Sequence, residues 1–192
     1  MTTLRVGVTG HRRIDNPAGV SAAVREALAR VRERFAATHL EVVSPLAEGA
    51  DRIVARAVLT EAGAAPTAPG AAPTESDAAP TVPGAALTVP LPFPKEDYAT
   101  DFAASDSKAE FEELLEQATR VEVMPATATR DEGYERAGRW VVEHSDVLLA
   151  LWDGAPSRGR GDTAAIVAYA RGRGLPVYWI HTNDGAPVAE EL

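Results

Sequence analysis

Apolar positions along the chain follow two different spacings. Short continuous apolar runs, typical of buried strands, alternate with longer stretches in which apolar residues recur every three or four positions, as on one face of a helix. The first run, 4–9, predicts a strand, and Asn16 with Pro17 predicts the start of a helix. That helix would bury Val20, Val24, Leu28, Val31 and Phe35. The chain therefore opens with strand, loop and helix.

The same unit recurs along the sequence. Further strands are predicted at 40–44, 87–91, 120–124, 146–151 and 176–180, and further helices at 48–62, 105–118, 132–144 and 163–171. Strands that alternate with helices are typical of right-handed βαβ units. We therefore predict an α/β fold: a three-layer, Rossmann-like parallel sheet of about six strands with helices on both faces, in a single domain over 1–192.

One stretch, 64–86, fits neither spacing. It consists mainly of alanine, proline, threonine and glycine and contains a near-repeat, 64–72 against 78–86. Prolines at this density prevent a helix, and there is too little apolar surface to offset the entropy of ordering. We expect a flexible insertion at the edge of the sheet.

Composition narrows the function classes. The chain has no cysteine, so disulfides and thiolate metal sites are excluded, and no apolar run reaches the length of a membrane span. We therefore expect a cytoplasmic protein without a membrane partner. The net charge of −9 argues against general nucleic-acid binding. The acids are concentrated at 63–119, with 10 Asp and Glu against 2 Lys and Arg, whereas 1–62 carries 9 Lys and Arg against 7 Asp and Glu.

Ligands of open parallel sheets bind beyond the carboxyl ends of the strands, where loops lead into helix N-termini. The first loop at that edge contains Thr9, Gly10, His11 and Arg12. Gly10 lets a ligand approach the backbone, His11 can donate or accept a hydrogen bond, and Arg12 can bind phosphate through its guanidinium fork. The alternative interpretation is a glycine turn followed by solvated arginines.

The second loop at this edge contains Glu48, Gly49 and Asp51. Either carboxylate could accept a hydrogen bond from a ribose hydroxyl or stabilise a sugar carbon, and Gly49 leaves room beside them. Alternatively, both acids only favour a helix N-terminus through its macrodipole.

The third loop follows the strand 146–151 and opens the last helix. Its glycines expose backbone N–H groups, a capping residue can begin the helix, and Arg158 with Arg160 would flank an anion pocket. The pattern is neither the dinucleotide fingerprint nor a P-loop. The candidate ligand-binding residues here are Trp152, Gly159, Arg160, Gly161, Asp162 and Thr163. No metal site and no cofactor are predicted, because no histidine has a partner at ligand spacing.

Taken in order, these three segments resemble the SLOG superfamily of Rossmann-like proteins, which includes the Lonely-guy phosphoribohydrolases and the DNA-processing protein A family. The resemblance rests on Gly10 to Arg12, on the helix start 48–52 and on the glycine-rich helix start 159–164. It spans the chain apart from 64–86, and small bacterial nucleotide-sensor members are the most similar. It implies a pocket for a nucleotide or nucleotide-derived ligand, with phosphate on the last loop.

The hydrolases of that superfamily carry a Gly-Gly-x-Gly-Thr-x-x-Glu signature, from which this chain departs. Asp162 stands between Gly161 and Thr163, and Ile166 stands where the glutamate would be. Hydrolysis would have to use Glu48, Asp51 or Asp162 instead. Binding without turnover is therefore the favoured interpretation.

The leading hypothesis is a module that binds or senses a nucleotide-type small molecule. One alternative is a nucleoside-monophosphate N-glycosidase (phosphoribohydrolase), or a related transferase, with Glu48 and Asp51 as catalytic carboxylates. Another is an interaction subunit with a vestigial pocket. The resemblance also implies a homodimer, although no helix carries an apolar stripe that predicts one, and a sensor would need a separately encoded effector.

Overall fold

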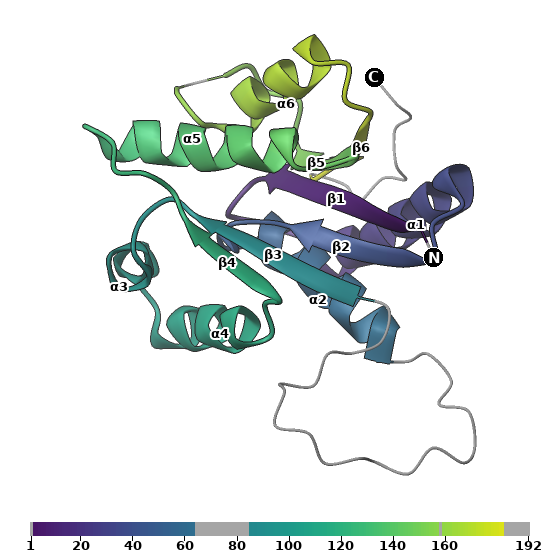
Figure 1. Ribbon diagram of the computed structural model, residues 1–192, viewed down its shortest axis with the longest axis horizontal. Coiled ribbons are helices and arrows are strands. Elements are labelled where there is room, and N and C mark those ends of the chain that lie inside the picture. The colour runs from purple at the N-terminus through teal and green to yellow at the C-terminus, as the bar shows by residue number, and fades with distance from the viewer. Residues whose placement is uncertain (1, 64–84, 158, 183–192) are drawn as a thin grey trace.

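A computed structural model describes residues 2–63, 85–157 and 159–182. Within these residues six parallel strands form one sheet in the order β4-β3-β2-β1-β5-β6 (Figure 1). The strands are β1 (Thr3–Gly10), β2 (His39–Val43), β3 (Ala85–Leu91), β4 (Arg120–Val123), β5 (Val147–Trp152) and β6 (Val177–His181). The predicted α/β fold with a Rossmann-like parallel sheet is confirmed.

Helices cover both faces of the sheet (Figure 1). The helices α1, α2 and α4 pack on one face around a core that includes Val24, Val54 and Phe111, while α5 and α6 pack on the other around Val141 and Ile166. Their bounds are α1 (Pro17–Phe35), α2 (Ala50–Gly63), α3 (Lys95–Tyr98), α4 (Ser105–Glu116), α5 (Arg130–Glu143) and α6 (Thr163–Gly172), with a 3₁₀ turn at Ala99–Asp101.

The central strands are apolar because both of their faces are covered. All five residues 147–151 of β5 are buried, as are Val6 and Val8 of β1. A continuous apolar run is the pattern expected of a parallel strand between two helical layers. Because these strands are buried in the core, their carboxyl ends hold the loops that follow them in fixed positions.

The chain reverses its direction across the sheet between β1 and β5. From β1 it proceeds outward through β2 and β3 to the edge strand β4, and then returns to place β5 on the other side of β1. Gly10 lies opposite Leu151 in that pairing. The connections on either side leave towards opposite faces, which opens a crevice at the carboxyl ends of β1 and β5.

Three local features differ from the sequence expectations. The second helix begins at Ala50 and not at Glu48, because Gly49 has a φ of 75°, outside the helical region. The segment after β3, for which no helix was predicted, contains α3, whose Tyr98 N–H donates to the carbonyl of Pro94 at 2.9 Å. The predicted insertion at 64–86 lies outside the described residues except for Ala85 and Ala86, which pair with β2.

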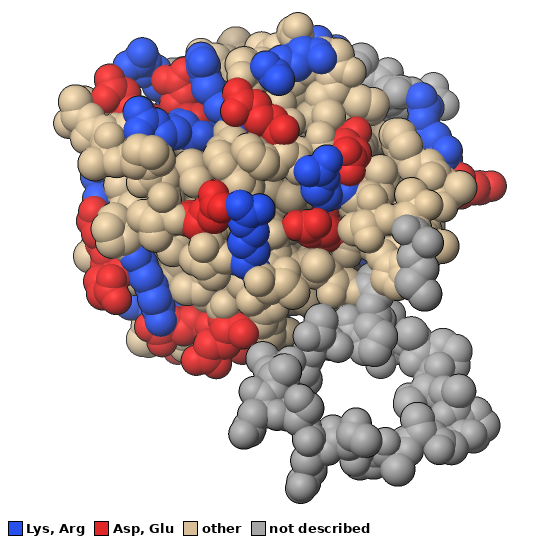
Figure 2. Space-filling model, in the orientation of Figure 1, with Lys and Arg blue, Asp and Glu red and all other residues tan. Residues whose placement is uncertain are grey.

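Charged side chains are interspersed by sign on the face drawn in Figure 2, without a large area of either sign. None of the helices described is both long and apolar enough to cross a membrane.

Candidate functional site

A cleft of about 300 Å³ lies at the carboxyl ends of the central strands. It is bounded by the end of β1, the loop after β2, one face of α5 and the start of α6. This is the crevice created by the reversal of the chain between β1 and β5. Of the thirteen residues predicted to bind a ligand, those lining it are Thr9, Gly10, His11, Arg12, Asp51, Arg160, Gly161, Asp162 and Thr163.

Gly10 ends β1 where only a glycine fits. A Cβ atom there would lie 2.4 Å from the Cβ of Ala50 and 2.6 Å from the carbonyl oxygen of Leu151. The next residue ties the loop on both sides, since the N–H of His11 donates to Leu151 at 3.0 Å and its carbonyl accepts from the N–H of Ala50 at 3.0 Å. The loop is therefore held between β5 and α2, at the floor of the cleft.

His11 is turned towards the β5 side of this floor. Its Nε2 lies 3.0 Å from Oδ1 of Asp153, which belongs to the third loop but was not among the predicted ligand-binding residues. The backbone N–H of Ala155 and then His11 itself hold the pKa of Asp153 below its ordinary value. Trp152 lies outside the main cleft, in a smaller hollow that His11, Asp153 and Thr163 also line.

Arg12 is an exposed cation of the cleft. Its guanidinium lies 5.3 Å from the centre of the Tyr134 ring, and it makes no ion pair with any carboxylate in the described ranges. Arg160, by contrast, contacts Glu132 at 3.1 Å and Glu135 at 3.3 Å. Arg12 is thus the cation whose charge is more available to an anionic ligand.

Asp51, in the first turn of α2, is buried at the side of the cleft. Its Oδ2 accepts a hydrogen bond from Ser44 Oγ at 2.9 Å and from the N–H of Ala47 at 3.2 Å. Burial raises the pKa of the carboxyl to about 7, although these hydrogen bonds and the nearby Arg12 oppose the rise. Asp51 therefore stabilises the loop after β2 through its hydrogen bonds. Its carboxyl group also stays protonated up to near-neutral pH.

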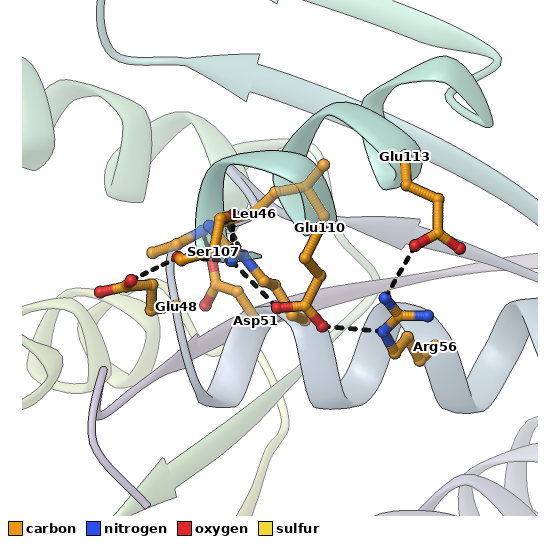
Figure 3. A network of polar contacts seen from close by, with 9 residues as sticks. Leu46, Glu48, Asp51, Arg56, Ser107, Glu110 and Glu113 are labelled. Atoms are coloured by element: carbon orange, nitrogen blue, oxygen red, sulfur yellow. Dashed lines mark hydrogen bonds and ion pairs between the residues drawn. The ribbon is translucent and has the colours of Figure 1, made fainter. Parts of the chain in front are cut away.

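Glu48 and Gly49 lie apart from this cleft. The carboxylate of Glu48 accepts a hydrogen bond from Ser107 of α4 and lines a separate open hollow (Figure 3). Only glycine fits at position 49, because a Cβ atom there would lie 2.5 Å from the carbonyl oxygens of both His11 and Arg12. The two acids of this loop, which the sequence placed together, therefore serve different surfaces.

The surroundings of Glu48 form a polar network that joins α2 to α4 (Figure 3). Arg56 contacts Glu110 at 2.9 Å and Glu113 at 3.1 Å. Arg52 donates to the carbonyl of Leu46 at 3.1 Å and contacts Glu110 at 3.0 Å. These contacts fix the position of α4 relative to the loop after β2.

The start of α6 is organised by Asp162. Its carboxylate caps the helix by accepting from the N–H of Ala165 at 2.9 Å, and it also accepts from the N–H of Gly159 at 3.0 Å. Gly161 has a φ of 72°, and a Cβ there would lie 2.6 Å from the backbone nitrogen of Glu135. Gly159 is exposed, buried Thr163 faces the cleft, and the expected partner Arg158 lies outside the described residues.

Two tyrosines in the cleft wall were not among the predicted site residues. Tyr134 of α5 donates to Asp101, and Tyr98 of α3 packs edge-on against Phe102 and Phe111. Burial raises the pKa of Tyr98 above its ordinary value, so its hydroxyl stays protonated. The α5 residues that line the cleft are spaced three or four positions apart, so they lie on one face of the helix. This spacing is the sequence feature that could have identified them: Tyr134, Ala137, Gly138 and Val141.

Arg130 fastens the α3 segment to α5. Its guanidinium contacts Asp97 at 2.8 Å, also pairs with Asp101, and lies 4.2 Å from the centre of the Phe93 ring. The segment that carries Tyr98 is therefore held against the helix that carries Tyr134, and together they close one side of the cleft.

No protein-family model matches the sequence, and no curated protein matches it. In fold, the chain is similar to a solved structure of DNA processing protein A from Helicobacter pylori. The TM-score is 0.53 and the identity 18%, and the match covers 96% of this chain and 70% of the other. At this identity the likeness supports the Rossmann-like fold alone.

The comparison also corrects one expectation. General nucleic-acid binding was excluded on the net charge of −9, yet the similar protein from Helicobacter pylori binds single-stranded DNA. The exclusion is therefore wrong. The physical reason is that the charge of a whole chain does not describe a local surface: the cleft contains Arg12, Arg160 and a helix N-terminus despite the acidic total.

Proposed function

We propose that this protein binds a nucleotide or a nucleotide-derived ligand in the cleft at the carboxyl ends of β1 and β5, as a SLOG-type module. The observation that carries the proposal is the meeting of Arg12, which has no ion-pair partner in the described ranges, with the N-terminus of α6 in one cleft at the reversal point of the sheet.

The cleft offers different chemistry to each part of such a ligand. Arg12 suits a phosphate, as do the first N–H groups of α6 other than that of Ala165, which Asp162 caps, because these groups lack intrahelical partners. Tyr134, which is partly exposed, provides a ring surface for a base, and Asp51 provides a polar group for a ribose hydroxyl. The volume of about 300 Å³ lies at the lower end of small-molecule sites.

Arg12→Ala is expected to weaken nucleotide binding about tenfold to a hundredfold, since it removes a charge-assisted contact to phosphate. The matched control is Arg13→Ala, because Arg13 is the exposed neighbour and does not line the cleft. Equilibrium dialysis against nucleoside mono-, di- and triphosphates, with mass detection, measures the affinities. Equal affinities for both variants would contradict the site, and retention of no nucleotide by the wild type would favour an interaction subunit with a vestigial pocket.

A second candidate function, N-glycosidic hydrolysis of a nucleotide, is favoured by one observation. Asp51 lines the cleft with a pKa raised to about 7, so it can hold a proton for a departing base near neutral pH. Asp162 is the other described carboxylate that lines the cleft. Glu48 is the weaker choice, because its carboxylate is held by Ser107 outside the cleft.

Under that second candidate, Asp51→Asn would reduce base release about a hundredfold or more while leaving nucleotide binding in place. Glu48→Gln is the matched control and would retain base release. Time courses of free base by liquid chromatography test this. Base release that survives in Asp51→Asn would end the hydrolase assignment and leave binding without turnover.

A further inference from the structure

A second groove of about 550 Å³ lies between α1 and α2, beside the cleft. Apolar side chains contribute to its wall, with Ile14 and Pro17 on one side and Ile53 and Ala57 on the other. Four arginines line it as well, and Glu110 is the one described carboxylate that does so. The groove therefore combines apolar surface with an excess of positive charge, in a chain whose total charge is −9.

Two of these arginines are not neutralised. Arg25 and Arg12 form no ion pair with any carboxylate in the described parts of the chain. Arg56 differs from them, because Glu110 and Glu113 both contact its guanidinium. An anion that entered the groove would therefore meet two cations without displacing an acidic side chain.

Arg52 adds a hydrogen-bond donor that lacks a partner. Its side chain is 3% exposed, and its Nε and Nη1 atoms are occupied by Leu46, Ser107 and Glu110. Its Nη2 atom is buried and makes no hydrogen bond. The guanidinium of Arg52 also lies 4.5 Å from the centre of the Phe102 ring, so Arg52 is a fixed positive charge beside the groove.

Arg12 lines both the groove and the cleft, so the two hollows are adjacent. We propose that the groove is an anion-binding subsite for a second phosphate-bearing unit, joined covalently to the nucleotide in the cleft. The inference rests on the proposed function, and it specifies the ligand as a two-phosphate molecule of dinucleotide type. Arg25 binds the second phosphate, the positive charge of Arg52 favours it, and the apolar wall contacts the attached sugar or base.

The test compares one-unit and two-unit probes. Titration calorimetry at fixed salt measures the affinity of 5′-dAMP and of the 5′-phosphorylated deoxyadenosine dinucleotide for the wild type, Arg25→Ala and Arg30→Ala. Arg30 is the control because it lies on the same helix, is exposed, and does not line the groove. We expect the dinucleotide to bind the wild type more tightly than dAMP, and Arg25→Ala to weaken only the dinucleotide, by about tenfold.

The outcomes separate the two proposals. The subsite is overturned if dAMP binds and the dinucleotide binds no more tightly, or if Arg25→Ala lowers the affinity for both probes equally. In either case the proposed nucleotide site in the cleft is retained. If neither probe binds the wild type, the proposed function fails and the subsite fails with it. ADP-ribose serves as a further probe, because its two phosphates are joined as a pyrophosphate. Tighter binding of ADP-ribose than of the dinucleotide would identify the pyrophosphate as the linkage that the groove accepts.

Discussion

Gly49→Ala is expected to lower the free energy of unfolding by about 3 kcal/mol, through left-handed backbone strain and overpacking. Gly49 has a φ of 75°, and an added Cβ would lie 2.5 Å from two carbonyl oxygens, those of His11 and Arg12. Both oxygens belong to the loop that forms the floor of the cleft. Chemical denaturation of the two proteins measures the difference, and nucleotide affinity is expected to fall with it.

Gly174→Ala is the matched control for that experiment. Gly174 has a φ of 71°, but an added Cβ would meet nothing within 4 Å. Its substitution is therefore expected to cost about 1 kcal/mol from backbone strain alone. Equal losses of stability in the two variants would contradict a contribution from the close approach of the β1 loop to Gly49.

Asp51→Asn is expected to remove a pH dependence of stability worth up to about 4 kcal/mol. Burial raises the pKa of Asp51 to about 7 in the folded state. An acid with a raised pKa binds more protons folded than unfolded, so stability falls as pH rises from about 4 to about 7 and stays low above that. Asparagine keeps an oxygen for the contacts from Ser44 and Ala47 but cannot ionise.

Denaturation of wild type and Asp51→Asn from about pH 4 to about pH 8 tests this sign. The two proteins are expected to be similar in stability at the acidic end, with the variant more stable at the basic end. Asp131→Asn, which removes an exposed carboxylate from the first turn of α5, controls for the change in net charge. Parallel pH profiles of wild type and Asp51→Asn would contradict a buried, proton-holding carboxyl.

The fold could be predicted from sequence because its signals are local. Each strand is a short apolar run and each helix carries its own spacing and start signal, such as the Asn16 side chain that accepts from the N–H of Gly19 at 3.0 Å. The boundary of α2 was less predictable. A left-handed residue at Gly49 delays the helix, and glycine in a sequence does not reveal its own φ.

The cleft could be predicted only in part, because its walls come from distant segments. The loop residues after β1 and before α6 follow strand ends, which sequence reasoning can find. Tyr98 and Tyr134 reach the cleft through the packing of α3 against α5, and no local pattern reports that packing. Glu48 was grouped with Asp51 by proximity in sequence, yet its side chain turns to Ser107.

Hydrogen–deuterium exchange with and without 5′-AMP tests whether a nucleotide binds at the carboxyl ends of β1 and β5. We expect slower exchange in peptides covering 9–12 and 160–165, where the β1 loop and the start of α6 would meet the phosphate. In Arg12→Ala we expect no such slowing at the same AMP concentration. AMP binding that protects other segments and leaves these two unchanged would contradict a nucleotide site at the carboxyl ends of β1 and β5.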